Sequence, residues 1–371
     1  MKITRISVYQ TDLPLAEPYW LSGGRLKFEA LDATFVKLET DAGVTGWGEG
    51  TPWGHTYVPA HGPGIRAGIE TMAPAILGQD PRRLEALERA MDACLPGHLY
   101  AKAPVDFAAW DISGQVQGMS LAAMLGGVEG DPGTRIVSSV SSGTPEEVYA
   151  RIERFRAQGN RAHSVKVGGN AEADIARIRY LEERRLPEEQ ILYDVNRAWS
   201  RREAMLVMQA TAGLGVTFEQ PCESLDDIAA VRAVTSAPIA VDESLVTVQD
   251  AARVAREGIA EVVDIKLNRV GGLTRARRMR DIALAHGQQI YAMATGCTVM
   301  ADAEAAALAQ SVPESHRLGC WACQDMITVD VAPGRGPRNT GGLLRIGEAP
   351  GLGFAPDEDV LGPPLAVYSE G

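Results

Sequence analysis

Ile191-Leu192-Tyr193-Asp194 is a short apolar run that ends on a carboxylate, and the pattern recurs at Val216-Thr217-Phe218-Glu219 and at Ile239-Ala240-Val241-Asp242. Each run has the length and the β-branched or aromatic content of a buried strand. The segments between them are long enough for a helix and a turn. This alternation predicts parallel strands joined by helical crossovers, with a carboxylate at the end of each strand.

Working outward, the same rhythm extends from about residue 135 to residue 321. The strand ends are spaced 23 to 28 residues apart. One strand and one helix in each such interval, repeated eight times, predict an α/β fold of the (β/α)8-barrel type. The expected strands are Ile136–Ser139, His163–Val167, Ile191–Val195, Val216–Gln220, Ile239–Glu243, Val262–Leu267, Gln289–Met293 and Arg317–Trp321.

The first third of the chain has a different pattern. Ala33–Thr40 and Val44–Glu49 read as a β-hairpin, and three helical segments follow at Gly62–Leu77, Pro81–Leu95 and Pro104–Gly118. We therefore expect an α+β capping domain over residues 1–130, a barrel domain over 131–328, and a segment over 329–371 that packs back on the capping domain. The Gly- and Pro-rich composition of this last segment favours an irregular path.

Composition narrows the partners. The 371 residues include 36 Lys and Arg against 48 Asp and Glu, which gives a net charge of −12. Such an acidic chain lacks the basic face that nucleic acids or anionic membranes require, so neither is expected as a partner. The start has no secretory signal, which favours a cytoplasmic enzyme, and we expect a homo-oligomer. The odd number of cysteines argues against a disulfide framework, and we interpret Cys320 and Cys323 as packed, reduced side chains.

Asp194, Glu219 and Asp242 stand at the C-terminal ends of three successive predicted strands, which is where barrel active sites are built. Three carboxylates that converge would repel one another unless a divalent cation lies between them. Oxygen ligands favour Mg²⁺ over zinc or copper. Caps of the following helices or surface ion pairs would explain any one of the three, but not all three in register.

Two lysines lie in equally unusual places. Lys166 is in the second predicted strand and Lys266 is in the sixth, and these strands lie opposite each other in an eight-stranded barrel. A nearby divalent cation lowers the pKa of a lysine ammonium, so the free amine becomes a usable base near neutral pH. Together with a metal that chelates a carboxylate substrate, the residues predict removal of an α-proton. The second lysine then delivers a proton on the opposite face or protonates a leaving group.

These motifs resemble those of the enolase superfamily, in its muconate lactonizing enzyme/mandelate racemase group. The resemblance rests on Asp194-Val195-Asn196, Phe218-Glu219-Gln220-Pro221, Val241-Asp242-Glu243-Ser244 and Asp264-Ile265-Lys266-Leu267-Asn268. It implies that Asp194, Glu219 and Asp242 bind Mg²⁺ and that Lys166 and Lys266 form the acid/base pair. One departure is Ser164, which replaces the first lysine of the family's Lys-x-Lys motif, so Lys166 is expected to depend more on the metal and on Asn196.

For the substrate, the loops Pro18–Arg25, Thr51–Tyr57 and Gly319–Asp325 are similar to those of racemases and epimerases of proline betaine and 4-hydroxyproline betaine. Aromatic faces suit a quaternary ammonium, which forms no hydrogen bonds. The resemblance thus implies an isomerase, a betaine racemase or 2-epimerase, that works by two-base proton transfer. The expected substrate contacts are Tyr57, Trp321, Trp20, His55 and Asn196.

Two other readings stay open at this level. A lyase of the same superfamily, such as a hydroxyproline or sugar-acid dehydratase, or a cycloisomerase, shares every metal ligand and differs in having a leaving group. Non-catalytic ligand binding on a retained barrel is disfavoured, because the metal ligands and both lysines are present together.

Overall fold

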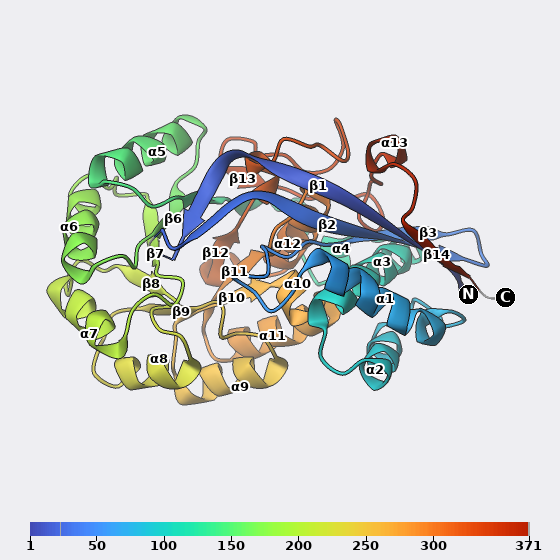
Figure 1. Cartoon of the computed structure of the whole chain (residues 1–371), viewed down its shortest axis with the longest axis horizontal. Helices are drawn as coiled ribbons and strands as arrows, with labels where there is room; N and C mark the ends of the chain where they lie inside the picture. Colours follow the sequence, from blue (N-terminus) through green and yellow to red (C-terminus); the bar gives the residue numbers. More distant parts are fainter. Residues whose placement is uncertain (23, 370–371) are drawn as a thin grey trace.

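The computed structural model describes residues 1–22 and 24–369. Gly23 of the expected first loop, and residues 370–371 at the end of the expected C-terminal segment, lie outside the described residues. Figure 1 shows a barrel ringed by helices at one end of the molecule and a smaller layer of strands and helices at the other. The chain begins and ends side by side in this smaller layer.

The barrel contains eight parallel strands in sequential order from β5 to β12. A parallel bridge between Ile136 and Cys320 brings the first strand next to the last, so the barrel is nearly closed. The (β/α)8 fold with an N-terminal cap is thereby confirmed. The strands are β5 Val137–Val140, β6 Ala162–Lys166, β7 Gln190–Asp194, β8 Thr217–Glu219, β9 Ile239–Val241, β10 Val262–Lys266, β11 Gln289–Met293 and β12 Arg317–Cys320.

Helices alternate with these strands and cover the outside of the barrel (Figure 1). Several begin at a side-chain cap, as at Thr144, Ser200 and Thr247, where the residue three positions later completes a capping box. The helices are α5 Pro145–Ala157, α6 Ala171–Glu182, α7 Arg201–Ala210, α8 Leu225–Arg232, α9 Val248–Glu257, α10 Leu267–Val270, α11 Leu273–Ala285 and α12 Val299–Gln310, with short 3-10 turns at Glu314–His316 and Cys323–Met326.

The cap is an antiparallel sheet, in the order β14-β1-β2-β3, packed on helices. The C-terminal strand β14 pairs with β1, so the end of the chain returns to the cap. The cap strands are β1 Ile3–Leu21, β2 Leu26–Thr40, β3 Thr45–Gly50 and β14 Ala366–Ser369, and its helices are α1 Gly62–Ile76, α2 Leu84–Cys94, α3 Leu99–Gln117 and α4 Leu121–Met124. The small elements β4 Thr134–Arg135, β13 Leu343–Leu344 and α13 Glu358–Leu361 complete the set.

One helix boundary differs from expectation. We expected the third cap helix to begin at Pro104, but α3 begins at Leu99 and includes Pro104. Proline ends most helices because it lacks an N–H and crowds the preceding turn. Here the ring packs close to Gly50 of β3, where a side chain would meet it. Tight contact between α3 and the cap sheet therefore outweighs the local preference of proline.

Buried polar contacts fix the cap on the barrel. The Asp106 carboxylate of α3 accepts hydrogen bonds from the Thr274 backbone N–H (3.0 Å) and hydroxyl (2.5 Å) at the start of α11. Glu49 of β3 accepts hydrogen bonds from the backbone N–H and hydroxyl of Thr298 at the start of α12. This anchorage lets the long β1–β2 ribbon reach across the barrel toward β6 and β7 (Figure 1).

Several sequence expectations concern features outside the site. All five cysteines are free in the described part of the chain, and Cys320 and Cys323 are buried, as expected for packed, reduced thiols. None of the described helices combines the length and apolar character that a membrane span requires. The domain boundaries near residues 130 and 328, and the homo-oligomer, stay predictions.

Candidate active site

The polar side chains singled out from the sequence lie at one end of the barrel. Lys166, Asp194, Glu219 and Lys266 are the last residues of β6, β7, β8 and β10, and Asp242 directly follows β9. The register pairs Lys166 with Asp194 and Asp194 with Glu219 across neighbouring strands. All are buried. The short apolar strands thus place these ionisable groups together at the C-terminal end of the barrel, beneath the cap.

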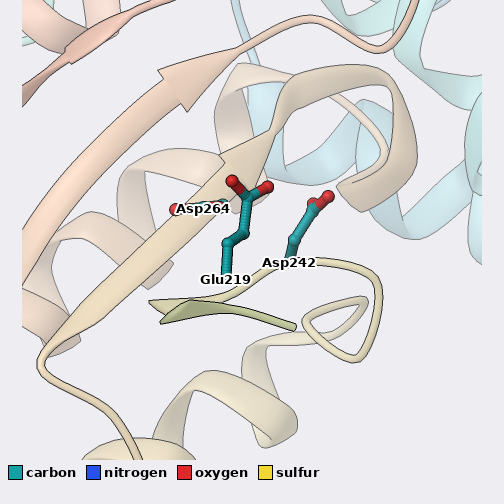
Figure 2. Close-up of side chains that lie close together, drawn as sticks. All are labelled: Glu219, Asp242 and Asp264. Carbon is teal, nitrogen blue, oxygen red and sulfur yellow. The ribbon is translucent and has the colours of Figure 1, made fainter. Parts of the chain in front are cut away.

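Three carboxylates form the tightest cluster. Oxygen atoms of Glu219, Asp242 and Asp264 all lie within 4.8 Å of one another, as Figure 2 shows. Asp264 was not among the expected metal ligands. It lies two residues before Lys266 on β10, and alternate residues of a strand face the same side, so strand periodicity could have found it. Both of its carboxylate oxygens lack a hydrogen-bond partner among the described residues.

The cluster is electrostatically costly as it stands. Burial, followed by the charges of neighbouring carboxylates, raises the pKa of Glu219 and of Asp264 well above the ordinary carboxyl values. Burial also acts on Asp242, but the nearby Arg269 and Lys266 outweigh it and lower its pKa. Buried, like-charged oxygen ligands with unpartnered lone pairs are the donor set that a hard divalent cation stabilises. The residues present therefore fit Mg²⁺.

Asp194 lies beside this cluster and binds Lys166. The Lys166 ammonium donates a hydrogen bond to Asp194 Oδ2, and Asn196 Nδ2 donates to the same oxygen at 3.0 Å. Burial lowers the pKa of Lys166, but Asp194, Tyr19 and Glu219 together raise it well above its ordinary value. Asn196 thus supports Lys166 by holding its carboxylate partner. The Ser164 hydroxyl donates a hydrogen bond to Glu219 Oε2 at 3.4 Å. A lysine at this position, as in the family's Lys-x-Lys motif, would instead bring a positive charge to the carboxylate cluster.

Lys266 occupies the opposite side of the barrel, four strands away from Lys166. Its ammonium donates a hydrogen bond to Asp242 Oδ2 at 2.6 Å, and Arg269 Nη2 donates to Asp242 Oδ1 at 2.7 Å. Burial lowers the pKa of Lys266, whereas the charge of Asp242 raises it, and the net shift is upward. Each lysine is therefore held by a carboxylate at its own side of the site.

The cavity between the two lysines is small, about 40 Å³. Tyr57, Trp321 and Asn196 line it, and their contact with a substrate stays a prediction. Trp20 and His55, also expected as substrate contacts, are not among its lining residues: Trp20 is 41% exposed and lies over Lys27, and His55 is exposed on its loop. Both belong to the loops we selected, but their side chains face away, because strand residues alternate in direction along β1 and residue 55 lies in a turn.

The aromatic side chains at the cavity already pack against one another or lie near cations of the protein, unlike a cage that is open to a quaternary ammonium. Trp321 packs on Trp53 with ring centroids 5.4 Å apart, and Trp53 packs edge-on against Tyr19 at 5.4 Å. The ring of Tyr57 already has cations near it, with Lys266 Nζ at 5.6 Å and Arg197 at 5.5 Å from its centroid. Tyr19 and Trp53, which were not among the expected substrate contacts, also line the cavity. Hydroxyl groups of Tyr19, Ser139 and Thr295 add hydrogen-bonding capacity.

Comparison with known proteins decides the family. Residues 147–360 match the family described as enolase C-terminal domain-like, and residues 4–126 match the mandelate racemase/muconate lactonizing enzyme N-terminal domain. The chain belongs to the enolase superfamily. The matched ranges cover both the barrel and the cap, in agreement with the resemblance of the strand-end motifs.

Among curated relatives, the chain is 37% identical over 370 residues to a cis-3-hydroxy-L-proline dehydratase from Roseibium aggregatum, with full coverage of both chains. Several relatives named as racemases or epimerases are 28% to 32% identical. The expectation of an isomerase was wrong, because the similarity to the dehydratase favours a lyase. The motif residues that suggested it are expected to serve proton abstraction in either class, so they do not separate the two reactions.

Solved structures share the whole fold. A mandelate racemase/muconate lactonizing enzyme homologue from Silicibacter pomeroyi is 64% identical, with a TM-score of 0.96 and full coverage of both chains. An enolase superfamily member from Roseovarius nubinhibens, complexed with magnesium, is 47% identical, with a TM-score of 0.95 and full coverage of both chains. A superfamily member of nearly identical fold thus binds magnesium.

Proposed function

We propose that the protein is a Mg²⁺-dependent lyase that removes water from a small cyclic hydroxy amino acid, with cis-3-hydroxy-L-proline as the expected substrate. The full-length similarity to the dehydratase from Roseibium aggregatum is the observation that carries this proposal. The small cavity supports it, because the site favours a compact ring over a long or branched ligand.

The opposed lysines match the stereochemistry of this reaction. In cis-3-hydroxy-L-proline the hydroxyl and the carboxylate lie on the same face of the ring, so the α-hydrogen lies on the opposite face from the hydroxyl. Removing both therefore needs a base on one face and an acid on the other. Lys166 on β6 and Lys266 on β10 lie across the barrel from each other and supply these two positions.

The elimination uses the two lysines in different protonation states. One lysine, as the free amine, takes the α-proton from C2, and the other, as the ammonium, gives a proton to the hydroxyl on C3. The C2–H and C3–O bonds break, a C2=C3 double bond forms, and water leaves. A bound Mg²⁺ would neutralise the carboxylates that now pair with the lysines and would stabilise negative charge on the substrate carboxylate.

Other residues of the chain would hold the ligand and exclude water. Asp194, Glu219 and Asp242, with Asp264 behind them, are the candidates for holding the metal. Arg269 and Asn196 orient Asp242 and Asp194 through the hydrogen bonds described above. The rings of Tyr19 and Trp53 from the cap pack with Trp321 from the barrel along the cavity wall, where they would exclude water from a bound ligand.

The direct test is to incubate the purified protein with MgCl₂ and cis-3-hydroxy-L-proline and to follow, by NMR, loss of the signal of the carbon-bound proton at the hydroxylated C3. We expect turnover that EDTA abolishes and excess Mg²⁺ restores. Lys166→Ala and Lys266→Ala should each lose about 10²–10⁴-fold in kcat, the usual contribution of a positioned acid or base. Failure of the Mg²⁺-loaded protein to consume this substrate would contradict the proposal.

A further inference from the structure

A second, larger cavity lies beside the catalytic one. It measures about 820 Å³ and is formed between the start of α1 and the start of α3 in the cap and the loops after β7, β8 and β9 in the barrel. Tyr57 lines both cavities and so forms the wall between them. The proposed dehydration makes no use of this space, because both lysines line or border the smaller cavity.

Charged groups of opposite sign stand side by side in this second cavity with hydrogen-bonding capacity left over. Arg197 Nε lies 3.7 Å from Glu243 Oε1, yet neither Arg197 Nε nor Glu243 Oε2 has a hydrogen-bond partner in the described part of the chain. The side chain of Glu243 is 6% exposed. Buried polar atoms usually find partners, so one unsatisfied donor next to one unsatisfied acceptor points to a ligand with both kinds of group.

Arg269 adds a second donor at the same wall. Its side chain is 4% exposed, and its Nη1 atom lacks a partner among the described residues, although its Nη2 atom is bound to Asp242. Arg269 also lines this cavity. Two guanidinium groups with free donors suit a carboxylate, and the adjacent Glu243 oxygen suits an ammonium.

The remaining lining combines apolar side chains with the polar residues His61, His98, Glu223, Ser244 and Thr247. Val58, Ile65, Leu99 and Val246 all contribute to the wall, together with the ring of Tyr100. A site that combines apolar walls with convergent polar groups is the usual form of a small-molecule pocket. An apolar side chain would therefore fill the body of the cavity while the charged end of the ligand meets Arg197 and Glu243.

The backbone at this wall is unusual. Asn196 and Arg197 both adopt left-handed conformations, with φ of 46° and 65°. Such conformations cost free energy in residues other than glycine and persist where the surroundings hold them for a purpose. This turn directs Asn196 to the catalytic carboxylate Asp194 and Arg197 to the second cavity, where Arg197 also donates a hydrogen bond to the Tyr57 carbonyl at 3.1 Å.

From these observations we propose that the second cavity binds a free α-amino acid with an apolar side chain, with its carboxylate at Arg197 and Arg269 and its ammonium at Glu243. This ligand is distinct from the substrate of the catalytic cavity. The proposal rests on the geometry of the second cavity and stands or falls independently of the dehydratase reaction.

The test uses isothermal titration calorimetry with the Mg²⁺-loaded protein and three probes that share a phenyl ring but differ in their charged groups. L-Phenylalanine carries both charges, 3-phenylpropanoate lacks the ammonium, and 2-phenylethylamine lacks the carboxylate. We expect L-phenylalanine to bind and each of the other two to bind at least tenfold more weakly. No heat of binding for L-phenylalanine up to 20 mM, or equal affinity for all three probes, would overturn the proposal.

Matched variants locate the binding. Arg197→Met and the cavity-filling Val246→Trp should each weaken L-phenylalanine binding at least tenfold. Arg201→Met removes an arginine with a carboxylate partner, Asp227, at 2.5 Å on the exposed face of α7, and it should leave the affinity unchanged. Lys166→Met, in the catalytic cavity, should also leave it unchanged. Binding lost in Lys166→Met but kept in Val246→Trp would place the ligand in the catalytic cavity and refute the proposal.

Discussion

Arg269→Met probes how far Asp242, a proposed metal ligand, depends on one buried cation. Arg269 Nη2 donates to the Asp242 carboxylate at 2.7 Å and to the Asp242 carbonyl at 2.5 Å, and its Nε donates to the Leu245 carbonyl at 3.1 Å. Methionine keeps the apolar volume but removes all of these donors. Asp242 then retains only Lys266 among its two cationic partners.

The stability effect follows from the burial of this pair. Breaking one side of a buried ion pair costs about 3–5 kcal/mol. At about 2.1 cal/mol/K per residue, a chain of 371 residues unfolds with an entropy of about 0.8 kcal/mol/K. The melting temperature should therefore fall by about 4–6 °C in Arg269→Met, as measured by calorimetry or circular dichroism.

Arg275→Met is the matched control. Arg275 is 8% exposed, close to the 4% of Arg269, and it pairs with Glu88 at 3.0 Å and Asp92 at 2.6 Å between α11 and the cap. It should lose similar stability but keep its activity. Arg269→Met should lose activity by about 10²-fold, because a displacement of about 1 Å at a reacting centre has that effect. Equal activity in the two variants, with both folded, would refute the positioning role of Arg269.

Three further predictions concern the metal, the pH dependence and the lysines. Saturating Mg²⁺, at about 100 times its dissociation constant, should stabilise the protein by about 2.7 kcal/mol in thermal denaturation. Asp264→Asn should raise the melting temperature of the metal-free protein, because it relieves repulsion within the carboxylate cluster. A lower melting temperature would argue against that repulsion. Burial raises the pKa of Glu189, but His163 and Arg156 outweigh it and bring it to about 2 from 4.5. The Glu189 carboxylate stabilises the fold above pH 4.5 and loses its contribution as the pH falls toward 2. Arg156→Met should therefore remove about 1–3 kcal/mol of this acid-sensitive stability, as measured by urea titrations across that pH range. An unchanged dependence of the free energy of unfolding on pH would contradict the role of Arg156. L-Proline has no leaving group, so in D₂O it can report only exchange of the α-proton. Replacement of the lysine that acts as base should abolish α-deuterium exchange, while replacement of the other lysine should preserve it. Equal exchange in Lys166→Ala and Lys266→Ala would show that the lysines do not divide the roles.

The barrel could be predicted from the sequence because its strands are short apolar runs at a regular spacing. Strand β11, Gln289–Met293, has the same bounds in the structure as in the prediction. Strand β10, Val262–Lys266, ends one residue before the predicted end at Leu267. The strand-end positions of Asp194, Glu219 and Lys266 follow from the same pattern. Periodicity and position in the strand suffice for these features because they depend on local sequence alone.

Other features depend on tertiary contacts that no local pattern records. Strand periodicity places Asp264 on the same side of β10 as Lys266, but its closeness to Asp242 depends on the pairing of β10 with β9 in the barrel. Pro104 stays within a helix because of its contact with β3. Trp20 and His55 belong to loops of suitable composition, but their side chains lie outside the cavity lining. The choice between isomerase and lyase depends on the substrate, since both reactions use the same lysines.

The relative rates with the two 3-hydroxyproline epimers test the central claim most directly. In cis-3-hydroxy-L-proline the α-hydrogen and the hydroxyl lie on opposite ring faces, whereas in trans-3-hydroxy-L-proline they share a face. Lysines on opposed strands β6 and β10 predict that the Mg²⁺-loaded protein dehydrates the cis epimer at least 10²-fold faster in kcat/KM, as measured by NMR. Equal rates for the two epimers, or a preference for the trans epimer, would contradict the account.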